Sequence, residues 1–151
     1  MQFLPKKKLL TGLAVAAVSA VSVLSLAAFA QGHLDAELRS GDIRMPATMK
    51  AGQKYDVAVK VKNVGSVQWQ GRDFQLMSKI SRGPSGAPTQ RDEFTPHVYL
   101  KDCVDTNART EFHYKVEAPT WTGNWELTMS MAKGYSRFGD IVKKTVKVVG
   151  D

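Results

Sequence analysis

The sequence predicts an all-β fold, an antiparallel sandwich of about seven short strands. After residue 45, apolar residues recur with a period of two, which is the spacing of a strand that buries one face. Clusters of turn-forming residues separate these runs, so the strands are expected to be short. Apolar residues at helical spacing are absent from this part of the sequence. Together these observations favour two sheets packed face to face over a helical fold.

The clearest strand covers residues 54–62. Apolar and polar side chains alternate along it, with Tyr55, Val57, Val59 and Val61 on one side and Lys54, Asp56, Ala58, Lys60 and Lys62 on the other. Burial of one such apolar side chain contributes about 1.5–3 kcal/mol, so we expect this strand at the centre of the core. Asn63 and Gly65 end the strand, because both residue types accept the positive φ of a turn.

The remaining strands are expected at residues 74–80, 98–100, 109–117, 125–131 and 141–149. Met129 and Met131 lie on the apolar side of their strand and are expected to fill the core, since methionine suits irregular gaps. Residues 81–94 are rich in Gly, Pro, Ser, Thr and charged residues, which predicts a long exposed loop. Loops of this length are uncommon unless they are mobile or functional.

The N-terminal 30 residues have the three parts of an export signal. Lys6, Lys7 and Lys8 precede an apolar run over residues 9–27, and Ala28-Phe29-Ala30 is a small-residue cleavage site. We therefore expect a signal peptide at 1–30, an N-terminal segment at 31–44 and the sandwich domain at 45–151. We expect the product to be exported, to the periplasm or outside the cell, and to contact a membrane only through an uncleaved signal.

Composition limits the class of partner. A mature chain of about 120 residues forms one small domain. Three of the 21 Lys and Arg residues lie in the signal, so the formal balance falls from +7 to +4 when it is removed. Exported proteins rarely meet nucleic acid, so the mildly basic surface favours a protein or an anionic glycan at the cell envelope. Cys103 is the only cysteine, which excludes an intramolecular disulfide; we expect a buried, inert thiol, the alternative being an exposed thiol open to mixed disulfides.

Four short motifs frame the strands. They are Met45-Pro46-Ala47-Thr48-Met49 followed by Ala51-Gly52-Gln53, then Asn63-x-Gly65-x-x-x-Trp69, Ala118-Pro119-x-x-x-Gly123-x-Trp125, and Phe138-Gly139-Asp140. They span residues 45–149 and resemble the four-tryptophan (FW) domain, an immunoglobulin-like module also found in an autophagy cargo receptor. The resemblance implies an immunoglobulin-like sandwich that acts without catalysis, as a spacer or as an adhesion or interaction element.

The motif residues also make physical sense as fold determinants: turn formers that shape corners and aromatic residues that fill the space between the sheets. The set is Asn63, Gly65, Trp69, Pro119, Gly123, Trp125, Phe138 and Gly139. Of the four family tryptophans only Trp69 is clearly in place, while Met129 stands at the position of the strand tryptophan.

No catalytic or cofactor motif is present. The sequence lacks a nucleophile elbow, a phosphate-binding glycine loop and zinc-spaced Cys/His pairs, so we expect no enzymatic activity and no cofactor. An alternative is copper binding by His33, His97 and His113, since imidazole and soft sulfur ligands suit that metal. Cleavage after Gly32 would make His33 the mature N-terminus and would allow a histidine brace like that of lytic polysaccharide monooxygenases, but cleavage after Ala30 matches the signal better.

Contact candidates lie where charge and an aromatic residue coincide, in and after the 81–94 segment. They are Arg82, Arg91, Tyr99 and Lys101. The leading hypothesis is contact with a protein or glycan through these residues. A third hypothesis is a structural subunit of the envelope that forms homo-oligomers by pairing its edge strands.

Overall fold

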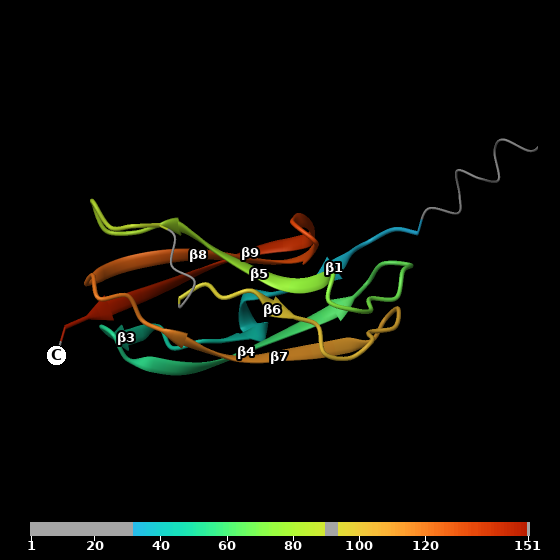
Figure 1. Ribbon diagram of the computed structural model, residues 1–151, viewed down its shortest axis with the longest axis horizontal. Coiled ribbons are helices and arrows are strands. Elements are labelled where there is room, and N and C mark those ends of the chain that lie inside the picture. Colours follow the sequence, from blue (N-terminus) through green and yellow to red (C-terminus); the bar gives the residue numbers. More distant parts are fainter. Residues whose placement is uncertain (1–31, 90–93, 151) are drawn as a thin grey trace, which may run out of the picture. The chain divides into compact units, whose positions relative to one another are not determined.

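The computed structural model describes residues 32–89 and 94–150, which form two packed β-sheets with no α-helix among them (Figure 1). Sheet A has four strands: β1 (Ala36–Glu37) and β2 (Ile43–Arg44) pair with β4 (Lys54–Asn63), which also pairs with β7 (Arg109–Glu117). Sheet B has five strands in the order β3 (Thr48–Lys50), β9 (Ser136–Val149), β8 (Gly123–Lys133), β5 (Phe74–Arg82) and β6 (Val98–Tyr99). A short 3₁₀ turn, η2 (Ser40–Asp42), lies between β1 and β2.

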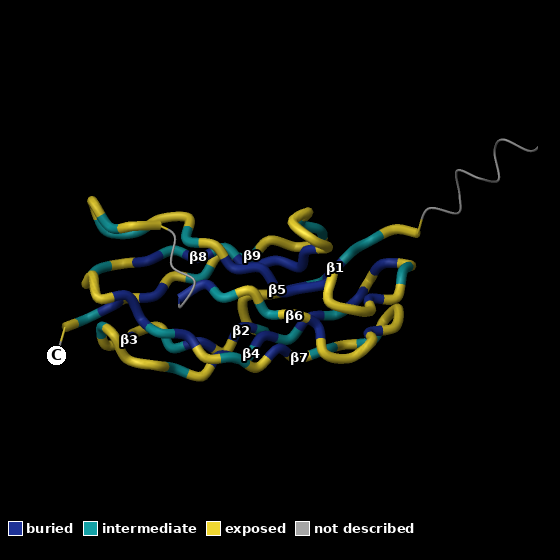
Figure 2. Tube along the Cα trace, in the orientation of Figure 1, coloured by how far each residue is buried: buried dark blue, intermediate teal, exposed yellow. Residues whose placement is uncertain are grey.

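The strand order confirms the predicted immunoglobulin-like sandwich. Strands β4 and β7 share one sheet, and β9, β8 and β5 form the centre of the other, which is the arrangement of that fold. All pairings are antiparallel except that of β3 with β9. The buried residues lie between the two layers (Figure 2). Each sheet therefore has one face in the core and one outer face.

The alternation of apolar and polar residues predicted strand bounds well, except at a β-bulge in β9. Strand β7 has the predicted bounds, and β4 extends one residue further, to Asn63. Strand β9 begins at Ser136, before the predicted start at residue 141. The register between β8 and β9 shifts opposite Ser130, and Gly139 has a φ of 70°. This bulge breaks the period of two, so the first part of β9 carries no alternation to read.

The sandwich begins before residue 45. Strands β1 and β2 both pair with β4, and Ala36, Leu38 and Ile43 belong to the hydrophobic core. The 31–44 range that the sequence suggested as a separate N-terminal segment therefore supplies an edge of sheet A from residue 36 onward. Strands of two residues are too short to show alternation, which explains why they were not predicted. The predicted signal peptide at 1–30 lies outside the described residues.

Two aromatic groups fill the core. Trp69 packs against Phe74 at 6.3 Å between ring centroids and against Phe138 at 5.5 Å. Trp125 makes an edge contact with Phe94 at 5.9 Å. Both tryptophans are completely buried. Met129 and Met131 of β8 are also buried in the core, as the sequence predicted.

Most described residues of the 81–94 segment are exposed, as the sequence predicted, but Phe94 at its end is packed in the core. Phe94 is buried in the core, and a Cβ at Gly83 would lie 2.9 Å from the ring of Trp125. The Ala87 N–H donates to the Pro84 carbonyl at 3.0 Å, which closes a turn. The prediction missed that Phe94 packs against Trp125 and that Pro84 packs against Gly123. Gly83 and Phe94 thus pack against Trp125 at one end of the core, whereas the described residues between them are exposed or half-buried.

None of the described residues forms a helix with the length and apolar character needed to cross a membrane.

Candidate functional site

The outward side chains of sheet B form the most distinctive surface of the described residues. They alternate with core residues along β5, β6, β8 and β9, and the strand register places them on one face. We call this surface the outer face of sheet B. Its residues are Gln75, Met77, Lys79, Arg82, Tyr99, Asn124, Glu126, Thr128, Ser130, Ala132, Arg137, Lys143, Thr145 and Lys147.

Cations dominate this face. Lysine or arginine stands at five of its positions, Lys79, Arg82, Arg137, Lys143 and Lys147, whereas Glu126 is its one carboxylate. Glu126 is already occupied: its Oε1 accepts a hydrogen bond from the Ser81 hydroxyl at 2.8 Å and lies 3.3 Å from the Lys143 ammonium. The hydrogen bond from Ser81 and that from Lys143 lower the pKa of Glu126. The face therefore keeps an excess of positive charge.

Arg137 lies on this face without a counter-charge. Its Nη1 donates one long hydrogen bond, 3.3 Å, to the Thr128 hydroxyl. Its Nε and Nη2 are buried and have no hydrogen-bond partner, and the same is true of the Ser130 hydroxyl, whose position lies between Thr128 and Ala132 on β8. Burial lowers the pKa of Arg137 from its ordinary value. Since buried polar groups are nearly always hydrogen-bonded, this guanidinium is an exception that calls for an explanation.

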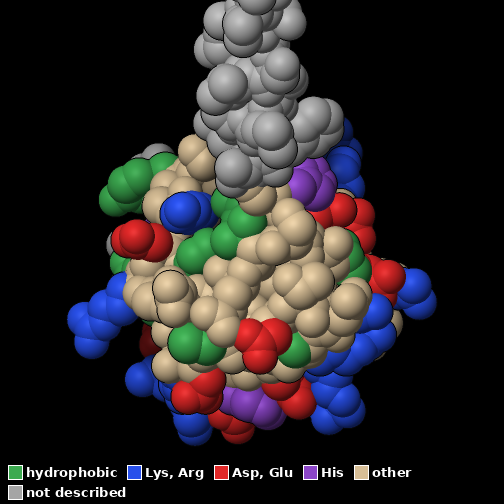
Figure 3. All heavy atoms as spheres, turned by 90° about the vertical axis from the view of Figure 1, so that its right-hand side faces the viewer, with side chains coloured by type: hydrophobic (Ala, Val, Ile, Leu, Met, Phe, Trp, Pro, Cys, Tyr) green, Lys and Arg blue, Asp and Glu red, His purple; other side chains and the backbone are tan. Residues whose placement is uncertain are grey.

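The outer face of sheet A is different. There the outward carboxylates are matched by cations across the strands: Lys54 with Glu117, Lys115 with Asp56, and Arg109 with Glu37. These are exposed pairs at 3.5–4.0 Å, each worth less than about 1 kcal/mol. The pattern is that of an ordinary solvated surface. Seen from the end of the sandwich, charged side chains lie around its perimeter (Figure 3).

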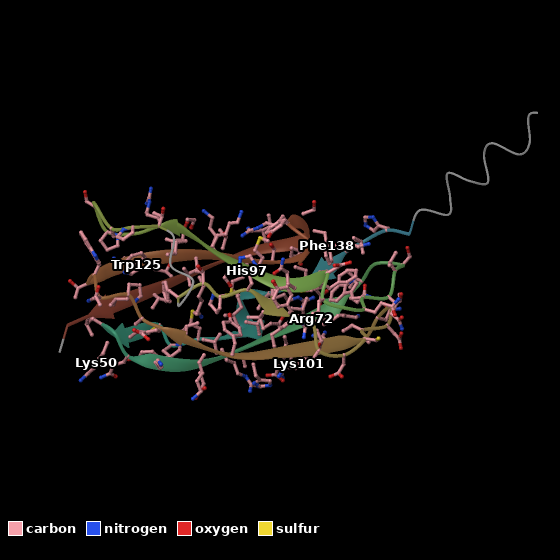
Figure 4. All side chains as sticks on the ribbon, viewed as in Figure 1. Lys50, Arg72, His97, Lys101, Trp125 and Phe138 are labelled. Carbon is pink, nitrogen blue, oxygen red and sulfur yellow. The ribbon has the colours of Figure 1, made fainter. Side chains whose placement is uncertain are left out.

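Tyr99 marks the edge of sheet B and is half exposed, at 51%. Together with Arg72 and Lys101 it lines a shallow hollow of about 560 Å³. Figure 4 shows Arg72 and Lys101 beside β6. A second cleft, of about 160 Å³, lies between residues 98–102 and residues 110–113 of β7. An exposed aromatic ring with two cations beside it is a combination of residue types found at contact surfaces.

The structure brings only some of the sequence-predicted residues together. Tyr99 and Lys101 line both hollows. Arg82 lies at the other end of β5, opposite Glu126, so it shares the outer face of sheet B without touching that edge. Arg91 lies outside the described residues. Arg72 was missed because it sits alone in a turn, and Arg137 was missed because the bulge hides its position on the sheet.

The three histidines belong to separate parts of the fold. His33 lies 3.8 Å from Asp35, and its backbone N–H donates to the Ser66 hydroxyl at 2.8 Å. His97 contacts the side chain of Gln75 at 2.8 Å, and His113 is an exposed residue of β7. Among the described residues no three His, Cys, Asp or Glu side chains gather in a way that would hold a metal ion.

Cys103 is exposed, so the expectation of a buried, inert thiol is wrong. It precedes Val104, which is buried and pairs with Trp69 through an isolated bridge. The alternation at this point turns Cys103 away from the core.

The motif residues occupy constrained positions. Asn63 and Gly65 are buried at the end of β4, and a Cβ at Gly65 would lie 2.3 Å from the His33 carbonyl oxygen. Pro119 is buried, and Gly123 has a φ of 133° and packs against Pro84. These glycine positions leave no room for a side chain.

No family model matches the chain, and no curated protein matches it. Among solved structures, it is similar to the CARDB domain of a Pyrococcus furiosus protein, at 14% identity and a TM-score of 0.49 over 78% of this chain and 95% of that one. It is also similar to part of a β-glucosidase from Listeria innocua, at 11% identity and a TM-score of 0.47 over 80% of this chain and 16% of the enzyme. A DNA glycosylase from Pseudomonas fluorescens matches at 10% identity and a TM-score of 0.48, over 77% of this chain and 29% of its own. The fold assignment rests on the two sheets of the chain itself.

Proposed function

We propose that this chain is an exported, non-catalytic binding module that contacts a protein or an anionic glycan at the cell envelope. The contact surface is the β6 edge with the adjoining outer face of sheet B. The observation that carries the proposal is the half-exposed ring of Tyr99 in a hollow with Arg72 and Lys101. Aromatic and arginine side chains are the residue types that carry most binding energy at interfaces.

Two of the three groups with shifted pKa values among the described residues, Tyr114 and Glu126, are not prepared for proton transfer at neutral pH. Active sites gather groups whose pKa values are displaced toward the working pH. Among the described residues, burial raises the pKa of Tyr114 to about 12, further from neutrality, and Tyr114 packs against the core. Glu126 is held in its ionised form by its hydrogen bonds. Neither change prepares a general acid or base for neutral pH.

The test compares two exposed tyrosines on the mature domain. Tyr99→Ala and Lys101→Ala are each expected to reduce binding to a native envelope fraction about tenfold. Tyr135→Ala is the matched control, because Tyr135 is 88% exposed at the β8–β9 turn, away from the hollow. Equal binding by all three variants and the parent would exclude the β6 edge as the contact surface.

We also propose that the chain is a divergent member of the four-tryptophan family. The support is local: Asn63 and Gly65 form the turn after β4, and Trp69 packs against Phe138, which precedes Gly139. An experimental structure of a four-tryptophan domain with its equivalent tryptophan in contact with the aromatic residue before the last strand would agree. A different partner for that tryptophan would count against membership.

Export is proposed on the Lys6–Lys8, apolar and Ala-Phe-Ala pattern of the N-terminus. The intact mass of the protein from its native exported fraction tests it. A chain that starts at Gln31 is expected, and a chain that starts at His33 with bound copper would favour the histidine-brace alternative instead.

A further inference from the structure

We propose that the outer face of sheet B binds a linear, uronate-bearing polysaccharide, with Arg137 pairing one of its carboxylates. The inference rests on the proposed function, because it names the partner class of the same surface.

Arg137 is the centre of the site. A guanidinium forms its strongest contacts as a bidentate pair with a carboxylate, and this one has no carboxylate. Its single hydrogen bond, to Thr128, is long, and two of its three nitrogens have no partner. Rotation of the Arg137 side chain toward a ligand carboxylate would therefore break one weak hydrogen bond and form two charge-assisted ones.

The other cations continue the site along the strands. Lys143 and Lys147 follow Arg137 on the outward side of β9, and Lys79 and Arg82 lie on β5. Four residues of a strand, the separation of Lys143 and Lys147, span about 13 Å, so these charges form a band along the sheet rather than a cluster. A band of this kind matches a polymer with repeated charges better than a small anion.

The side chains between the cations favour a polysaccharide over an acidic peptide. Thr128 and Thr145 lie beside Lys143, and Asn124 lies opposite Lys147. Hydroxyl and amide groups between charges suit a ligand whose carboxylates are separated by hydroxyls. Tyr99, at the edge of the same face, offers a ring against which a sugar can stack. The hollow beside Tyr99 lies at the strand edge, next to the band of cations rather than within it.

The experiment measures binding of the mature domain to polygalacturonate by calorimetry at two salt concentrations. The same polymer with its carboxylates methyl-esterified is the uncharged control, and polyglutamate represents an acidic polypeptide. Binding is expected for polygalacturonate only, and it should weaken as salt rises. Equal binding of polyglutamate would overturn the polysaccharide assignment, and binding of the esterified polymer would overturn the role of the carboxylate.

Three variants locate the site. Arg137→Gln is expected to weaken binding of polygalacturonate about tenfold or more. Lys79→Gln/Lys147→Gln removes two cations of the face that have no ion pair, and should weaken binding and flatten its salt dependence. Lys60→Gln/Lys62→Gln removes the same charge from the outer face of sheet A and should leave binding within about twofold. Equal losses in both double variants would overturn the site, since they would report net charge alone.

Failure of this inference and failure of the proposed function give different results. If Tyr99→Ala loses the envelope partner while polygalacturonate does not bind, the module stands and the polysaccharide assignment falls. If polygalacturonate binds through Arg137 while Tyr99→Ala keeps its envelope partner, the assignment of an acidic polysaccharide is supported and the β6 edge is excluded as the contact surface. Circular dichroism of each variant verifies that the sandwich is intact.

Discussion

Asn63 and Val104, 41 residues apart in the chain, are joined in the core by a hydrogen bond from the Asn63 amide to the Val104 carbonyl at 3.0 Å. The same amide donates to the Val67 carbonyl at 2.9 Å, and its oxygen accepts from the Gly65 N–H at 3.1 Å. One buried side chain thus satisfies three backbone groups of two loops that meet at the end of the sandwich. Those loops carry Trp69 and Val104, which pair through the isolated bridge.

Asn63→Ala is expected to lower the free energy of unfolding by about 2–3 kcal/mol, because it leaves buried backbone groups without a partner. Urea unfolding followed by tryptophan fluorescence measures the change. Asn124→Ala is the control, since Asn124 is an exposed residue of β8, and it should shift stability by less than about 0.5 kcal/mol. Similar values for the two variants would show that the buried amide is not a determinant of the fold.

Gly139→Ala tests the contact between the β9 bulge and the first strand. A Cβ at Gly139 would lie 2.5 Å from the Ala36 nitrogen, and the residue has a φ of 70°. Gly134 has a φ of 59° with open space around it, so Gly134→Ala reports the backbone cost alone, about 1–2 kcal/mol. We expect Gly139→Ala to cost clearly more than Gly134→Ala in thermal unfolding.

The two variants should also differ in hydrogen exchange. Only Gly139→Ala should speed exchange of the β1 amides, because β1 must move away to make room for the new methyl group. Loss of protection at β1 in Gly134→Ala as well would mean that the hairpin as a whole, rather than the contact, holds the strand.

The fold was predictable where one rule acted over many residues. Strand β7 alternates without interruption, and its predicted bounds are those observed. Strands β1 and β2 have two residues each, so no period exists to be read, and their position depends on pairing with β4. The start of β9 was hidden because the bulge at Gly139 shifts the alternation within one strand.

The candidate site was less predictable than the fold. Tyr99 and Lys101 were found because they are neighbours in the sequence, and the structure places both at one hollow. Arg137 and Thr128 share a face only through the β8–β9 register, which follows from the length of the turn and from the bulge. Phe94 was assigned to an exposed loop because it is a lone aromatic residue among polar ones, and its burial depends on Trp125. Such contacts are set by tertiary packing and leave no local pattern.

The raised pKa of Tyr114 predicts that the protein loses stability at high pH. Desolvation by burial raises its pKa from 10.0 to about 12, an effect that Ser78 opposes, although the two hydroxyls form no hydrogen bond of normal geometry. The unfolded state then releases the phenolic proton near pH 10 and the folded state near pH 12. Stability contributed by the neutral phenol is complete below about pH 10 and is lost as the pH rises to about 12, by roughly 3 kcal/mol.

Tyr114→Phe removes this titration. Its free energy of unfolding should fall less steeply than that of the parent between pH 10 and 12, and at pH 7 it should be close to that of the parent because the lost hydroxyl has no partner. Tyr135→Phe is the control, since Tyr135 is almost fully exposed. Parallel pH profiles for the parent and Tyr114→Phe would contradict the assignment of the titration to Tyr114.

Phe94 tests whether the segment after β5 is structural. Its ring packs edge-on against Trp125, and both side chains are buried, so Phe94→Ala is expected to cost about 3–5 kcal/mol and to increase the solvent exposure of Trp125. Acrylamide quenching of tryptophan fluorescence and urea unfolding measure the two effects. Pro88→Ala in the same segment is the control, because Pro88 is exposed and should leave both nearly unchanged. Deletion of residues 83–90 keeps Phe94 but removes Gly83, which also packs against Trp125, so we expect it to lower stability, and loss of binding would then report damage to the core rather than a contact made by the segment. Deletion without loss of stability would contradict this and would leave the segment free to act as a binding loop.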